Sequence, residues 1–263
     1  MASYGYDKTA PLDARIEETV STPEWTRERI TFAGANGARA IAYLYMPTNA
    51  PRPVQAIHFM PAGDVAGGLR SLSDSISDRM AIYVRGGRAV FGVVLEGYIE
   101  RLRPASEVPP PIESAEYADR MIGRVIDLRR GLDYLETRPD VDRTRMVAMA
   151  PSAGSTLGMI LAAFEPRYRG IVFLGAGIPE AYRRIIAVAS PISFVPHIAI
   201  PKLILQGRYD EDTPLRTAAE PLYKLLPEPK RLVLYDGGHV APLDVQMRET
   251  APWIDDLLGR VFR

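Results

Sequence analysis

The chain of 263 residues contains no cysteine, which excludes disulfides, thiolate metal sites and a cysteine nucleophile. Its three histidines and scattered carboxylates show no metal-ligand spacing. Thirty-two basic residues balance 32 acidic ones, so no global field attracts nucleic acid or an anionic membrane. No apolar run is long enough to span a membrane, and the first residues lack a signal-peptide core. We therefore expect a cytoplasmic protein with no metal, cofactor, nucleic-acid partner or membrane partner.

The composition is that of an ordinary globular protein, with 47% hydrophobic and 24% charged residues. The length suits one large α/β domain. Residues 1–25 are polar and without a clear period, which predicts a surface arm or a short helix. Residues 26–263 are predicted to form a single domain. Neither composition nor length excludes a homodimer.

Alternating apolar and polar residues begin with Arg29–Phe32 and resume with Ala40–Tyr45, and Asn36-Gly37 between them is typical of a hairpin turn. Beyond this hairpin, short apolar runs alternate with helical patterns, which predicts a mostly parallel sheet of about eight strands with helices on both faces. The strands expected there are Val54–Met60, Ala89–Leu95, Met146–Ala150, Ile171–Leu174, Lys202–Gln206 and Arg231–Tyr235. The most regular apolar stripe runs from Met121 to Leu135, and a helix there should end before Pro139.

Ser152 is the candidate nucleophile. It lies in Ala150-Pro151-Ser152-Ala153-Gly154, between an expected strand and an expected helix. A sharp strand-to-helix turn of this kind presents a serine hydroxyl, and it requires small residues two positions before and after. The same pentapeptide could instead form a simple helix N-cap. Ser155 is the competing serine, but it lacks small residues on both sides.

Asp210 is the candidate acid, because a strand breaks into the turn Gly207-Arg208-Tyr209-Asp210. Such a carboxylate orients a catalytic imidazole. Asp210 could also be an ordinary turn aspartate, and Glu211 and Asp212 are neighbouring candidates. Thr213-Pro214 is typical of a helix start, which makes Asp212 a candidate N-cap.

His239 is the candidate base, since Gly237-Gly238 precede it after the last expected strand. The alternative is a surface loop histidine. His58 in a strand and His197 between prolines are expected to be structural. The resulting order Ser…Asp…His is that of α/β-hydrolases and not of chymotrypsin-like or subtilisin-like enzymes.

An oxyanion would need two backbone donors. One is expected at Ala153, directly after the candidate nucleophile, and the other in the loop after the third strand. Gly63 is our choice in that loop, and Ala62 and Asp64 are alternatives.

With these residues in place, the chain from about Trp25 onward resembles the α/β-hydrolase superfamily, above all dienelactone-hydrolase-like and acetyl-esterase-like proteins. The first part also resembles the entry hairpin of prolyl-oligopeptidase-type catalytic domains. Dienelactone hydrolases proper use a cysteine, so their substrate is not implied here. The resemblance implies a serine esterase with the α/β-hydrolase fold. The stretches that carry it are Gly97–Arg101, Leu132–Asp140, Pro191–Phe194, Gly207–Asp210 and Gly238–Val240.

The expected substrate is a small ester in a shallow pocket. Residues 176–200 leave room for a minimal cap only, which should line this pocket. Further lining is expected from the loop at Ala62, Gly63 and Asp64, and from Tyr98, Ile99 and Phe194.

We therefore predict a carboxylesterase that cleaves short-chain esters through an acyl-enzyme, with Ser152, His239 and Asp210 as nucleophile, base and acid. A small peptidase or acyltransferase would use the same chemistry on another substrate. A non-catalytic binding protein with this fold is the third hypothesis, and the complete Ser/Asp/His set argues against it.

Overall fold

The computed structural model describes residues 2–61, 70–102 and 107–262. They form one nine-stranded sheet with the strand order β1-β2-β3-β5-β4-β6-β7-β8-β9. The first strands pair antiparallel as far as β3 with β5, and the remaining strands are all parallel. This confirms the predicted α/β-hydrolase architecture. The strands are β1 (Arg15–Ser21), β2 (Trp25–Ala33), β3 (Arg39–Pro47), β4 (Val54–Phe59), β5 (Ala89–Val94), β6 (Val141–Pro151), β7 (Ile171–Leu174), β8 (Lys202–Gly207) and β9 (Lys230–Tyr235).

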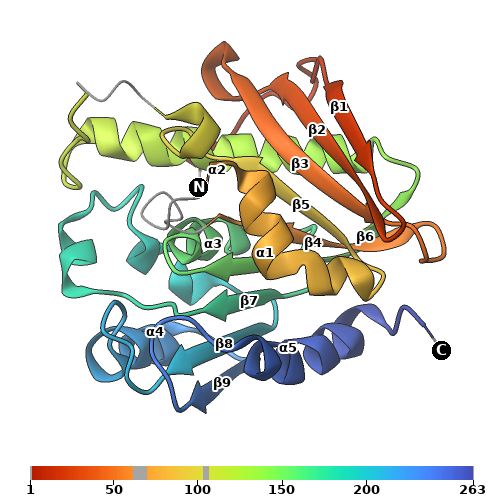
Figure 1. The fold of residues 1–263 in the computed structure, drawn as a ribbon. Coiled ribbons are helices and arrows are strands. Elements are labelled where there is room, and N and C mark those ends of the chain that lie inside the picture. The colour runs from red at the N-terminus through yellow and green to blue at the C-terminus, as the bar shows by residue number, and fades with distance from the viewer. Residues whose placement is uncertain (1, 62–69, 103–106, 263) are drawn as a thin grey trace.

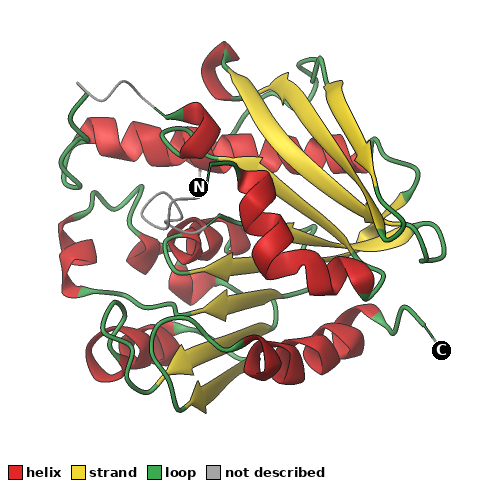
Figure 2. Cartoon of the chain, viewed as in Figure 1, coloured by secondary structure: helices red, strands yellow, loops and turns green. Residues whose placement is uncertain are grey.

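Helices cover both faces of the sheet (Figures 1 and 2). One face packs against α2 (Ala115–Glu136), α3 (Gly154–Ala162) and α4 (Glu220–Leu225). The other packs against α1 (Leu72–Arg85) and α5 (Leu243–Leu258). Because the parallel strands are covered on both sides, β4 and β5 are buried along their whole length. No helix of the described residues is long and apolar enough to cross a membrane.

Several local predictions are confirmed. The hairpin of β2 and β3 turns at Ala35–Gly37, as the Asn-Gly pair indicated. Helix α2 carries the buried stripe from Met121 to Leu135 and ends at Glu136, before Pro139. Ser114 caps its first turn by accepting a hydrogen bond from the Tyr117 N–H. The Asn-Gly pair and the apolar stripe thus predicted these two elements correctly.

The first 25 residues differ from the prediction, which was wrong in treating them as an arm or a helix. They contain β1, the edge strand of the sheet, which pairs with β2 only. Six of its seven side chains are exposed, so no alternation of apolar and polar residues marks it as a strand. Ahead of β1, a 3-10 turn at Ala2–Tyr4 buries the Tyr4 ring against Phe164 and Phe194.

Helix α2 lies close against the sheet at Gly131. A Cβ there would lie 2.6 Å from Val93 Cγ2 and 2.9 Å from Phe91 Cε1, both on β5. At Gly123 in the same helix, a Cβ would meet only the Ala35 Cβ, at 3.9 Å. The two glycines therefore differ in available space and not in secondary structure.

Gly131→Ala should lower the free energy of unfolding by about 1–3 kcal/mol, because it forces β5 and α2 apart. Gly123→Ala should raise it by about 0.5–1 kcal/mol, since alanine favours the helix and nothing obstructs its methyl group. Urea unfolding of both variants measures this. Equal effects would contradict the packing described.

Candidate active site

Ser152 lies in the turn between β6 and α3, and its backbone has a φ of +45°. A non-glycine residue in this left-handed region carries strain of about 1–3 kcal/mol, which the surroundings must hold in place. The Ser152 N–H donates to the Leu174 carbonyl oxygen at 2.8 Å, so the turn is tied to the end of β7. The chain thus has the sharp strand-to-helix turn that the pentapeptide predicted, and not a plain N-cap.

Gly154, which follows this turn, must lack a side chain because the backbone at Met60 and Pro61 passes close to it. A Cβ on Gly154 would lie 2.6 Å from the Met60 carbonyl oxygen and 2.8 Å from that of Pro61. The chain leaving β4 therefore runs against the start of α3. Ala153, between Ser152 and Gly154, forms no hydrogen bond through its N–H within the described part of the chain. The other candidate oxyanion residues, Ala62, Gly63 and Asp64, lie outside the described residues.

His239 lies between Ser152 and Asp210. Its Nε2 is 2.7 Å from Ser152 Oγ. Its Nδ1 is 2.9 Å from Asp210 Oδ2 and 3.0 Å from Oδ1. Because a carboxylate only accepts hydrogen bonds, Nδ1 is the donor, and Nε2 is left to accept the Ser152 hydroxyl proton. The three residues predicted from the sequence order are thus hydrogen-bonded in one line.

The Asp210 carboxylate is fully buried and hydrogen-bonded on both oxygens. Oδ1 accepts the N–H groups of Asp212 and Thr213, and Oδ2 accepts the Thr213 hydroxyl and the Gln206 side-chain amide. Burial raises the pKa of Asp210, but the Thr213 and His239 hydrogen bonds outweigh it and hold the pKa below its usual value. The carboxylate therefore stays ionised beside the imidazole.

Asp212 and Ser155, the two competing residues, lie differently. Asp212 is 74% exposed, and its Oδ2 is 3.8 Å from His239 Nε2, on the serine side of the ring. The expected N-cap role of Asp212 is wrong, because Pro214 precedes the helical turn Leu215–Ala219 and no side chain caps it. Ser155 is buried inside α3 and accessible at only 3%.

The His239 loop is held in place by groups that the sequence analysis missed. The Tyr235 hydroxyl donates to the Gly238 carbonyl oxygen at 2.8 Å and lies 3.3 Å from that of His239. Burial, with the Asp210 charge as a smaller cause, raises the pKa of Tyr235 to about 12, so it remains a donor. The imidazole crosses over Gly175, where φ is +60° and a Cβ would lie 3.0 Å from His239 Cε1. A tyrosine closely preceding Gly-Gly-His was the available signal.

The other two histidines lie elsewhere. His58 is buried in β4, and its Nδ1 is 2.6 Å from the Tyr168 hydroxyl. Burial, helped by the Arg167 charge, lowers the pKa of His58 to about 3, so this ring is neutral. His197 is exposed at the end of the 3-10 turn Val195–His197. Neither histidine lines the pocket at Ser152.

A pocket of about 420 Å³ opens at Ser152 and His239. It lies between α1, which contributes Asp78, Arg79 and Met80, and the chain after His239, which contributes residues 240, 241 and 243. The prediction that Tyr98, Ile99 and Phe194 line the pocket is wrong for this cavity. The Tyr98 ring lies under the Arg124 guanidinium, Ile99 is buried, and Phe194 packs on Tyr4.

Residues 176–200, expected as a minimal cap, form three short 3-10 turns at Glu180–Arg184, Pro191–Ser193 and Val195–His197. The Tyr182 hydroxyl is 2.7 Å from Thr156 Oγ1 on α3, and the Tyr4 hydroxyl donates to the Val188 carbonyl oxygen. No residue of this segment lines the pocket, so it covers α3 and not the candidate nucleophile.

Asp210, Asp212 and His239 form the one group within the described ranges that could hold a metal ion, since their candidate ligand atoms lie within 4.8 Å of one another. Two of the three are already hydrogen-bonded to each other. An ion there would need a ring nitrogen of His239 that is already hydrogen-bonded to Asp210 or to Ser152, so we assign no metal to the group.

No family model matches this chain, and no curated protein matches it. Solved structures do. The acetyl xylan esterase from Paenibacillus sp. R4 has a TM-score of 0.74 and 18% identity, over 98% of this chain and 92% of that one. Acetyl xylan esterase 1 from Thermoanaerobacterium sp. JW/SL YS485 has a TM-score of 0.72 and 18% identity, over 100% and 92%. The 2,6-dihydroxy-pseudo-oxynicotine hydrolase has a TM-score of 0.67 and 20% identity, over 91% and 69%.

These likenesses extend over nearly the whole chain, while the sequences have diverged to 20% identity or less. They agree with the mostly parallel sheet and with the helices on both of its faces. The chain has the α/β-hydrolase fold.

Proposed function

We propose that this protein is a serine carboxylesterase. The observation that carries the proposal is the line of hydrogen bonds from Asp210 through His239 to Ser152, which ends at 2.7 Å on a strained, presented serine. A serine hydroxyl is a weak nucleophile until a base at this distance takes its proton. The esterase names of several structural neighbours support an ester over other acyl substrates.

In the proposed reaction, Ser152 Oγ attacks the ester carbonyl carbon while His239 Nε2 takes the hydroxyl proton. The tetrahedral intermediate collapses, its bond to the alcohol oxygen breaks, and His239 gives the proton to that oxygen. Water then attacks the acyl-enzyme with the same base and releases the carboxylic acid. Asp210 stabilises the imidazolium in both halves and keeps its own ionised state.

The developing oxyanion needs donors that are in place before the reaction. The Ala153 N–H is one proposed donor. It precedes α3, whose N-terminus favours a negative charge. Gly63 remains our prediction for the second donor.

Ser152→Ala should abolish ester hydrolysis and labelling by a fluorophosphonate, because the atom that forms the covalent bond is removed. Ser155→Ala is the matched control, since this buried serine is three residues away on the same helix start. Hydrolysis of p-nitrophenyl acetate, gel fluorescence and thermal unfolding measure the effects. A labelled, active Ser152→Ala protein would refute the proposal.

Asp210→Asn should lower kcat by about three to four orders of magnitude, since an amide favours the wrong tautomer of His239. Asp212→Asn should lower it less than about tenfold, because an exposed charge about 4 Å away is worth only ~1 kcal/mol in water. Steady-state kinetics of both variants show whether Asp210 or Asp212 is the catalytic acid. The reverse order of effects would make Asp212 the acid.

Short acyl chains should be preferred, because residues 176–200 do not cover Ser152 and build no tunnel over it. Each methylene contributes about 0.8 kcal/mol only when it is buried. We expect kcat/KM to be higher for p-nitrophenyl acetate or butyrate than for decanoate or palmitate. A steady rise through the long chains would reveal a deep acyl site.

A further inference from the structure

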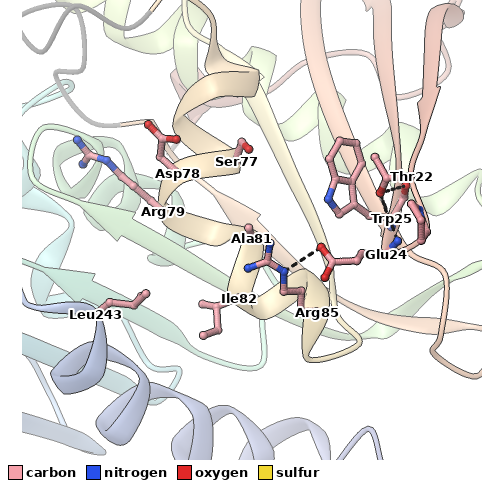
Figure 3. Close-up of a pocket in the computed structure, with 11 residues that line it drawn as sticks. Thr22, Glu24, Trp25, Ser77, Asp78, Arg79, Ala81, Ile82, Arg85 and Leu243 are labelled. Atoms are coloured by element: carbon pink, nitrogen blue, oxygen red, sulfur yellow. Dashed lines mark hydrogen bonds and ion pairs between the residues drawn. The ribbon is translucent and has the colours of Figure 1, made fainter.

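A second hollow, of about 510 Å³, lies beside the pocket at Ser152. Figure 3 shows it between α1 and the turn that leads into β2. Thr22, Glu24 and Trp25 lie on the sheet side, and Ala81, Ile82 and Arg85 lie on the helix side. We call this hollow the Trp25 groove. None of the steps proposed for ester hydrolysis uses this groove.

The Trp25 groove adjoins the pocket at Ser152. Asp78, Arg79 and Leu243 line both cavities, so these three side chains form a shared boundary between them. A substrate that fills the first pocket and extends past these residues enters the groove.

The direction of the groove identifies which part of an ester would reach it. The leaving oxygen must lie at His239 Nε2, because His239 returns the proton there. Val240 and Leu243, one and four residues after His239, line the pocket, and Leu243 also lines the groove. An alcohol part that extends from His239 past Leu243 would therefore reach the groove. The chain leaving β4 at Met60 and Pro61 lies instead against Gly154, at the start of α3.

The chemistry of the groove fits an apolar ring. The Trp25 indole packs against Tyr45, with ring centroids 5.0 Å apart, and this contact fixes its orientation. Ala81 and Ile82 are half-buried, and Leu243 is 48% exposed although it is large and apolar. Flat rings stack well on such surfaces.

The charges at the groove do not favour an anion. Glu24 and Arg85 form an ion pair at 3.0 Å, so each offsets the other. Asp78 and Arg79, at the junction with the catalytic pocket, add one exposed side chain of each charge, so the lining has no net charge. A neutral ring fits this lining better than a charged group does.

We propose that the Trp25 groove binds an aromatic ring carried by the alcohol part of the ester substrate. This inference rests on the proposed esterase function. The acyl part then occupies a short site at Ser152. Residues of α1 and of the start of β2 determine the specificity for the alcohol part.

The test is a series of phenylalkyl acetates with one to six methylenes, with n-alkyl acetates of equal carbon number as references. For the wild-type protein, kcat/KM of the phenylalkyl series relative to the n-alkyl series should pass through a maximum, at the chain length that brings the ring to Trp25. Trp25→Ala should lower this ratio about tenfold at the maximum, from lost stacking and burial. A flat ratio would overturn the groove assignment.

Two further variants separate binding from folding. Ala81→Trp fills the groove without removing a contact and should lower the same ratio. Phe262→Ala removes a partly exposed aromatic ring that lies outside the groove, and the ratio should stay unchanged. A maximum that survives both Trp25→Ala and Ala81→Trp, or falls equally in Phe262→Ala, would overturn the proposal.

The two proposals fail in different ways. If p-nitrophenyl acetate is hydrolysed but the ratio of kcat/KM for phenylalkyl and n-alkyl acetates shows no maximum, the assignment of the Trp25 groove is refuted. The esterase proposal then stays intact. If neither p-nitrophenyl acetate nor any of the alkyl acetates is hydrolysed, the esterase proposal is refuted, and the groove assignment with it.

Discussion

The His239 imidazole must reach Ser152 and Asp210 at the same time, and this requirement constrains the whole carboxyl edge of the sheet. Ser152 follows β6, Asp210 follows β8 and His239 follows β9, while β7 lies between the first two. The histidine loop therefore has to cross the end of β7. Gly175 makes the crossing possible, because a side chain there would collide with the ring. Tyr235 and the buried hydrogen bonds of Asp210 then hold the loop and the acid in place.

The parallel part of the fold and the antiparallel hairpin of β2 and β3 were predictable because their signals are local. Short apolar runs alternate with helical periods, and the Asn-Gly turn marks the hairpin of β2 and β3. Strand β1 was not predictable in this way. Its side chains are exposed on both faces, and what makes it a strand is its backbone pairing with β2, a contact that leaves no pattern in the residues.

The candidate site likewise has one part that local sequence signals predict and another part that they do not. Ser152, Asp210 and His239 each lie next to a local motif that turns the chain, and the order of the three motifs could be read directly from the sequence. The pocket wall depends on how α1 and α5 pack against the sheet, and this packing is made by contacts between segments far apart in the sequence. Tyr98, Ile99 and Phe194 were therefore assigned to the wrong surface, and Asp78, Arg79 and Leu243 were missed.

The central claim is that Ser152 forms a covalent acyl-enzyme. The most direct measurement is an acid quench of the protein within milliseconds of mixing with p-nitrophenyl butyrate, followed by digestion and tandem mass spectrometry. The account predicts a butyryl group on Ser152 that is absent from the protein quenched without ester. A butyryl group on Ser155 or on another residue, or hydrolysis with no modified serine under conditions where p-nitrophenol is released in a burst, would contradict it.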